Sequence, residues 1–255
     1  MPNYKKLFHA FFLFTAMIIS SHAATRGDVK VIEASENIRY LSQKLVKEYL
    51  FFYKYPQEIE VKNELDNILL KLNDDLRVIA MTTKDSDTKD VLEFLAYSKD
   101  QILEIFDEKP SKEKAALMLD YSETLLEGAD SIASAHNYDF SDEEKMLMVT
   151  KKMEYLLERI SKYYMAINVG FSNMTNKESM EKAIKKFEEN MYMINAYTYP
   201  EKQIKEQVKM NHSWESNKTF FSKSEAFFIP TLMFMSVNYL EETLLNISLY
   251  HSKNQ

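Results

Sequence analysis

The stretch from Ser35 to Lys47, SENIRYLSQKLVK, combines a helical apolar stripe with several polar hydrogen-bond donors. Arg39, Ser42 and Gln43 recur at steps of three and four residues, so on a helix they share one side. A guanidinium offers forked donors that match a planar oxyanion. We therefore treat this group as the candidate ligand-binding residues: Arg39, Ser42, Gln43 and Lys44.

No motif for catalysis is found in the sequence. It contains no glycine-rich phosphate loop, no nucleophile elbow and no zinc signature, and the chain has three glycines and no cysteine. His136, His212 and His251 have no histidine four residues away, and the methionines follow helical apolar stripes, which indicates core packing. We expect a protein that is not an enzyme and that uses no metal or cofactor.

One helical pattern occurs twice in the chain. Residues 153–167 repeat the apolar pattern of residues 38–52 after an interval of 115 residues, and both have the three- and four-residue steps of an amphipathic helix. The next segments, 69–80 and 184–196, repeat at the same interval. The tetrapeptide ETLL recurs after 119 residues. The matched apolar pairs of the first helix are Ile38/Met153, Leu41/Leu156, Leu45/Ile160, Tyr49/Tyr164 and Phe52/Ile167.

Helix breaks divide each copy into four helices. In the first copy these breaks are Pro56, the polar run 82–90 and Pro110 with Ser111. In the second copy Pro230 either starts the last helix or kinks it. Three capping-box pairs mark helix starts there: Ser141/Glu144, Thr175/Glu178 and Thr198/Glu201.

Four helices with short connections pack as an up-and-down antiparallel bundle. The sequence therefore predicts an all-α fold of two tandem antiparallel four-helix bundles, eight helices in total. We expect the first bundle in residues 26–138 and the second in residues 141–252. An end-to-end and a side-by-side arrangement of the bundles are both compatible with the pattern.

The first 23 residues have the features of a cleavable signal peptide. Lys5 and Lys6 precede a mostly apolar segment, and Ser21 to Ala23 fit a cleavage site. The apolar segment is shorter than the roughly 20 residues that cross a bilayer. Loss of the two lysines takes the formal net charge from −7 to −9, which argues against nucleic acid or an anionic membrane as partner. We expect a periplasmic protein without stable membrane insertion.

The Ser35–Lys47 stretch resembles the signature helix of the PilJ-like domain, the N-terminal sensor domain of type IV pilus methyl-accepting chemotaxis transducers. That domain is similar to the nitrate/nitrite-sensing domain of NarX-type kinases. The signature reads approximately AGRQRMLSQRIAK, and it is matched by Arg39, Leu41, Ser42, Gln43 and Lys47. The second copy, residues 150–162, keeps Leu156, Arg159, Ile160 and Lys162 but has Glu154 at the position of the signature arginine. The chain thus resembles two degenerate tandem copies.

The resemblance implies an extracytoplasmic helical bundle that receives a signal. In the nitrate sensors the signature arginine holds the anion between two symmetry-related helices, and here the counterparts in the second copy are Glu154, Glu158 and Arg159. If the two signature helices face each other, Arg39 opposes Glu154, and an internal ion pair replaces an anion site.

Two functions follow as expectations. One is a sensor-type module for signal transduction that binds a small ligand, such as an oxyanion, or an inner-membrane receptor or pilus-linked protein. The alternative is a structural or adaptor protein of the periplasm that makes protein–protein contacts and binds no small molecule.

Overall fold

The computed structural model describes residues 26–136, 138–223 and 228–254, and within these the chain is all α. The expected signal peptide, residues 1–23, lies outside the described residues. The helices are α2 (Arg26–Lys54), α3 (Ile59–Thr82), α4 (Ser86–Phe106), α5 (Lys112–Ala135), α6 (Asp142–Asn168), α7 (Met174–Ala196), α8 (Glu201–Ser222) and α9 (Pro230–Asn254).

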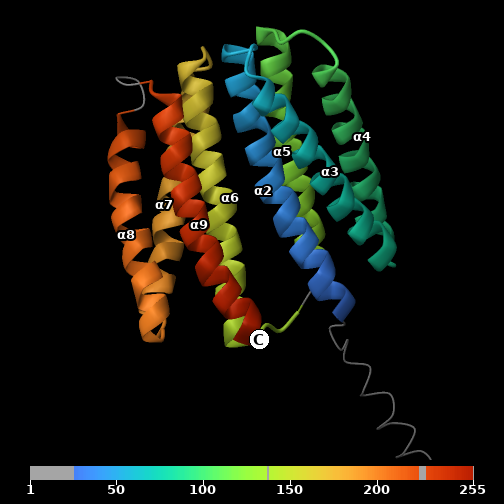
Figure 1. Cartoon of the computed structure of the whole chain (residues 1–255). Helices are drawn as coiled ribbons and strands as arrows, with labels where there is room; N and C mark the ends of the chain where they lie inside the picture. Colours follow the sequence, from blue (N-terminus) through green and yellow to red (C-terminus); the bar gives the residue numbers. More distant parts are fainter. Residues whose placement is uncertain (1–25, 137, 224–227, 255) are drawn as a thin grey trace, which may run out of the picture.

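The helices form two four-helix groups, as the sequence predicts. In the first group α2 packs against α3 and α5, and α4 packs against the same two helices. The second group repeats this cycle with α6 in the place of α2. Figure 1 shows the groups side by side, with α2 and α6 at the centre and running in the same direction. The prediction of two tandem bundles is confirmed, and the open question of their arrangement is answered by α2 packing against α6.

The matched apolar positions are buried in equivalent surroundings in the two bundles. Tyr49 and Tyr164 are both buried, as are Leu72 on α3 and Phe187 on α7. Phe52 alone among the matched residues of the first helix pair is half-buried, while its counterpart Ile167 is buried. The repeated stripe therefore specifies the same packing role twice.

Most predicted helix boundaries are confirmed. Ser141 and Glu144 form the expected capping box at the start of α6, in which the serine hydroxyl accepts from the backbone of Glu144 and the carboxylate accepts from the backbone of Ser141. Ser111 caps α5, and Pro230 starts α9 without kinking it. The polar run 82–90 is a shorter break than predicted, because α4 begins at Ser86 after the N-cap Asp85.

The other two predicted capping boxes are wrong. α7 begins one residue before Thr175, because Asn173 is the N-cap and its side chain accepts from the backbone of Asn176. Asparagine is among the strongest N-cap residues, so it determines the start. At α8 the N-cap is Pro200, which leaves Thr198 outside the helix.

No helix in the described part of the chain combines the length and the apolar character that crossing a membrane requires.

Candidate functional site

Ionisable side chains are concentrated along the seam, by which we mean the interface where α2 packs against α6. Lys47 on α2 and Glu158 on α6 form an ion pair of 2.8 Å, and both side chains are fully buried. The Lys47 ammonium also lies 3.4 Å from Glu48 and 4.7 Å from the centre of the Phe234 ring. Burial alone would lower the pKa of Lys47, but attraction to Glu158 and Glu48 raises it.

Glu241 on α9 belongs to the same charged group. Its own burial, followed by repulsion from Glu158, raises the pKa of Glu241 to about 8. Tyr40 lies in the same region, and burial together with the charge of Glu241 raises the pKa of its phenol. Three acids, Glu48, Glu158 and Glu241, and one base, Lys47, thus share a desolvated space between three helices.

A second charged group lies beside the seam, between α5 and α6, and contains the repeat-related lysine. Glu123 on α5 accepts two hydrogen bonds from Arg159, of 3.1 and 2.7 Å, and also pairs with the buried ammonium of Lys162. The Tyr163 hydroxyl donates to the same carboxylate at 3.1 Å. Burial alone would raise the pKa of Glu123, but Lys162 and Arg159 lower it to about 2. α5 of the first bundle is therefore tied to α6 of the second.

The two groups follow the internal repeat. Lys47 and Lys162 are separated by the repeat interval of 115 residues, and both side chains have 0 % exposure. Each lysine pairs with a carboxylate of the other bundle, Lys47 with Glu158 and Lys162 with Glu123. The two bundles are thus joined by two lysine–carboxylate ion pairs, of which Lys47–Glu158 is fully buried and Lys162–Glu123 has a partly exposed carboxylate.

Arg39 does not pair with Glu154, so the expected internal ion pair is wrong. Its guanidinium binds Glu36, one turn away, and Asp130 on α5, and it lies 5.6 Å from the centre of the Tyr155 ring. These carboxylates are available within the first bundle. The arginine therefore pairs with carboxylates of the first bundle and not with Glu154.

The side chains of the other candidate residues of α2 do not contact the Arg39 guanidinium but bind other groups. Ser42 donates to the Arg39 carbonyl at 2.8 Å. Gln43 donates to Ser42 at 3.1 Å and to the Ser122 carbonyl at 3.3 Å. Ser42 and Gln43 are fully buried. Lys44 lies on the other side, 3.4 Å from Glu64 and 3.3 Å from the Tyr40 hydroxyl. The four side chains do not converge on one point.

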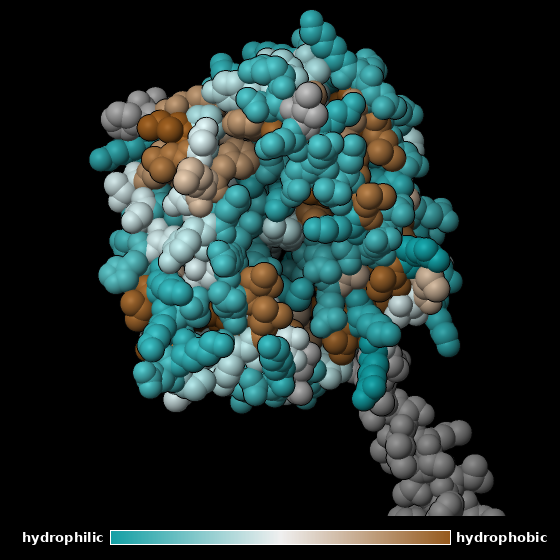
Figure 2. All heavy atoms as spheres, viewed as in Figure 1, coloured by the Kyte–Doolittle hydropathy of each residue, from teal (hydrophilic) through white to brown (hydrophobic). Residues whose placement is uncertain are grey.

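Lys44 and Glu154 instead line a common groove across the seam, which we call the Glu154 groove. It has a volume of about 390 Å³. Figure 2 shows the face that carries α9 and α3 hollowed near its centre, with mainly hydrophilic residues around the hollow. The lining residues come from α2, α3 and α6: Asn37, Tyr40, Leu41, Lys44, Glu64, Ile68, Lys71, Asp74, Asp75 and Glu154.

Glu154 is the most unusual side chain of this groove. Its Oε1 atom is buried and has no hydrogen-bond partner among the described residues. Burial raises the pKa of Glu154 to about 7, even though the nearby Lys151 opposes the shift. The carboxyl group is therefore divided between its two protonation states near neutral pH.

Arg39 lines a second groove, of about 480 Å³, which we call the Arg39 groove. Three of its lining residues are repeat-related to those of the Glu154 groove, in that Lys152 matches Asn37, Asn190 matches Asp75 and Arg39 matches Glu154. The grooves occupy related positions but differ in charge: Arg39 stands in the place of Glu154, Lys152 in that of the neutral Asn37, and the neutral Asn190 in that of Asp75.

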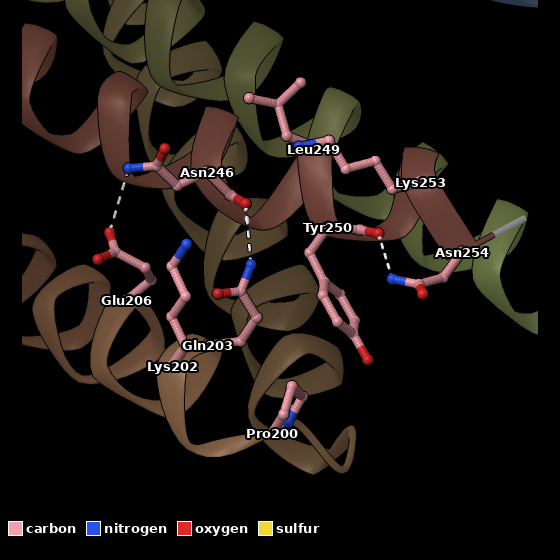
Figure 3. Close-up of a pocket in the computed structure, with 9 residues that line it drawn as sticks. All are labelled: Pro200, Lys202, Gln203, Glu206, Asn246, Leu249, Tyr250, Lys253 and Asn254. Carbon is pink, nitrogen blue, oxygen red and sulfur yellow. Dashed lines mark hydrogen bonds between the residues drawn. The ribbon is translucent and has the colours of Figure 1, made fainter.

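A third pocket, of about 320 Å³, lies between the start of α8 and the end of α9, away from the seam (Figure 3). Two of its polar side chains donate to neighbouring groups: Asn246 donates to Glu206 at 3.3 Å, and Gln203 donates to the Asn246 carbonyl at 3.1 Å. Contacts of this kind tie α8 to α9.

Sequence reasoning missed the acidic partners on α5 and α9, Glu123 and Glu241. The signal was present, because Lys47 and Lys162 are identical charged residues at equivalent places on apolar helix faces. A buried lysine requires a carboxylate nearby. The repeated ETLL motif, which starts at Glu123 and directly follows Glu241, lies on the helices that supply those carboxylates.

Comparison with protein-family models, with curated proteins and with solved structures found no match to this chain.

Proposed function

We propose that the protein is an exported sensor-type helical module that receives a small ligand in the Glu154 groove, at the seam between its two bundles. The observation that carries this proposal is the buried Oε1 atom of Glu154, which has no hydrogen-bond partner among the described residues, in an open groove that is lined by helices of both bundles. Ionisable groups with shifted pKa values in a cleft are typical of functional sites.

The energetics of the seam support a role beyond packing. Buried ion pairs such as Lys47–Glu158 are commonly no more stabilising than well-packed apolar residues of similar volume. A purely structural interface would be at least as stable with apolar residues at these places. Charged groups at the contact between two bodies instead make their relative position sensitive to a bound charge.

The groove also explains how binding would be transmitted. Its residues belong to α2 and α3 of the first bundle and to α6 of the second, so a bound ligand contacts both. A ligand that makes these contacts in only one arrangement of the bundles shifts the population toward that arrangement. The protein in this arrangement would then act on an inner-membrane receptor or a pilus-linked protein.

A ligand screen tests the proposal. The melting temperature of the purified protein is measured with small cations, anions and zwitterions, and each compound that raises it is titrated by calorimetry. We expect binding to weaken in Glu154→Gln and to persist in the control Glu189→Gln, which changes an exposed carboxylate on α7. The proposal fails if no compound binds, or if Glu154→Gln leaves every affinity unchanged.

The alternative, an adaptor that acts through protein contacts, is favoured by one observation. α9 carries large apolar side chains that are 44–66 % exposed: Leu232, Met235, Tyr239, Leu245 and Leu249. Chemical cross-linking in cells followed by affinity purification tests this function. A partner that is captured by the native protein and lost in Met235→Lys/Tyr239→Lys would support it, and recovery of the free monomer alone would count against it.

A further inference from the structure

The charge of the Glu154 groove indicates which class of ligand it takes. Its lining contains four carboxylates, Glu64, Asp74, Asp75 and Glu154, but two lysines. One of these, Lys44, lies 3.4 Å from Glu64. An anion that entered the groove would meet this excess of negative charge, whereas a cation would be attracted by it.

Two acids that line the groove, Glu154 and Asp75, have no hydrogen bond from any cation that the structure describes. Glu154 Oε1 has no hydrogen-bond partner among the described residues. Asp75 accepts a neutral hydrogen bond of 3.0 Å from Asn37, and burial raises its pKa. The nearby Lys151 ammonium donates to Asn37 Oδ1 at 3.1 Å. A positively charged donor from outside would supply the missing partner.

The remaining lining distinguishes an organic cation from a metal ion. Within the described part of the chain no group of three or more histidine, cysteine, aspartate or glutamate side chains is arranged to hold a metal. Tyr40, Leu41 and Ile68 add aromatic and aliphatic surface, which suits the carbon atoms of an amine. An aromatic ring also attracts an ammonium group, and the Lys44 ammonium already lies 5.7 Å from the centre of the Tyr40 ring.

We propose that the Glu154 groove binds a small organic cation, with its ammonium group against Glu154 and Asp75 and its carbon chain against Tyr40. This inference rests on the proposed ligand-binding function and names the chemical class of the ligand. The equivalent Arg39 groove, in which Arg39 and Lys152 replace Glu154 and Asn37, does not take the same cation.

Calorimetric titration with four probes tests the inference. Cadaverine dihydrochloride and choline chloride are the cations, and sodium nitrate and sodium glutarate are the anions. We expect at least one cation to bind and neither anion to bind in this groove. Glu154→Gln and Asp75→Asn should each weaken cation binding by about tenfold or more, because each removes a charge-assisted contact. Glu189→Gln should leave it unchanged.

A second readout separates a direct contact from a structural effect. A cation that binds beside Glu154 favours the ionised carboxylate, so binding at pH 7 should release protons. The release is measured as the difference in heat between two buffers of different ionisation enthalpy. It should disappear in Glu154→Gln, while the circular dichroism spectrum and the melting temperature show that this variant is folded.

The outcomes distinguish this inference from the function on which it rests. If an anion binds and Lys71→Met weakens it while the control Lys186→Met on α7 does not, the groove is a ligand site but the inference of a cation is wrong. If a cation binds equally well to Glu154→Gln and Asp75→Asn, the inference is also wrong. If none of the probes and no compound of the wider screen binds, both the inference and the proposed function are wrong.

Discussion

Charged residues of the seam are buried, so the loss of a partner charge is costly. Lys47 and Glu158 are fully buried, and each is the nearest opposite charge to the other in the structure. Removing one member of such a pair leaves an uncompensated charge, which costs more than the pair contributes. The same reasoning applies to carboxyl groups such as Glu241, for which burial favours the neutral form.

Replacement of Glu158 by glutamine should therefore be strongly destabilising. We expect Glu158→Gln to lower the free energy of unfolding by about 3 kcal/mol, because the Lys47 ammonium keeps its burial and loses the nearest of its carboxylate partners. Urea unfolding measures the change. The control Lys99→Met, which removes a lysine paired with the exposed Asp100, should cost less than about 1 kcal/mol. Equal losses in the two variants would contradict the argument.

Glu241 and Glu154 should make stability depend on pH. Their pKa values in the folded state, about 8 and about 7, are above the ordinary value of 4.5, so the folded protein binds these protons more tightly than the unfolded chain. Their contribution is fully present below pH 4.5 and is lost as the pH rises through 7 and 8. We expect Glu241→Gln to be relatively more stabilising at pH 8 than at pH 5. Chemical unfolding at the two pH values checks this, with the exposed Glu242→Gln as the control.

Whole elements depend on close contacts and on caps. α4 packs against α5 at Gly128, where a Cβ atom would lie 2.4 Å from Leu95 Cδ2. Leu95 is fully buried, so it cannot move toward solvent. At the start of α6, Ser141 accepts from a backbone N–H that has no partner within the helix.

A methyl group at Gly128 should destabilise the first bundle. Alanine favours a helix by about 1 kcal/mol over glycine, but the clash with Leu95 costs about 1–3 kcal/mol. We expect Gly128→Ala to lower or at best maintain the melting temperature, whereas Glu127→Ala at the exposed neighbouring position should not lower it. A clear rise in Gly128→Ala would show that α4 and α5 can separate at no cost.

Loss of the cap at α6 should be measurable. We expect Ser141→Ala to lower the free energy of unfolding by about 1 kcal/mol, because one backbone N–H loses its acceptor. Thr175→Ala is the matched control, since this threonine lies inside the first turn of α7 and Asn173 is the cap there. Thermal unfolding of both variants distinguishes them, and equal losses would contradict the assignment of the caps.

Across the whole molecule, the parts that could be predicted are those that local pattern determines. The 115-residue interval, with the breaks at Pro56, at 82–90 and at Pro110 with Ser111 and the helix starts of the second copy, predicted eight helices in two bundles. The side-by-side arrangement was not predictable, because the apolar stripe of a central helix can be covered in more than one way. The partner of Arg39 was missed because Asp130 is 91 residues away in the chain. Only the packing of α2 against α5 brings it near.

The bundles should stay together when the chain between them is cut. The seam joins α2 to α6 through Lys47–Glu158, and Glu123–Lys162 ties α5 to α6. We expect a protein with a protease site inserted between Asp139 and Phe140 to elute as one species after complete cleavage. Size-exclusion chromatography followed by denaturing electrophoresis checks this. Separation of the fragments would show that the seam is too weak to hold the bundles.

Because α2 and α6 pack in parallel within one polypeptide, the two repeat-related grooves can differ in sequence. In a symmetric dimer of a single repeat, every substitution appears in both halves, so the grooves remain identical copies. A covalently joined pair is free of that constraint, and here Glu154 stands opposite in charge to its equivalent, Arg39. One molecule can thus carry two grooves of different charge, and a compound that binds in the Glu154 groove need not compete for the Arg39 groove.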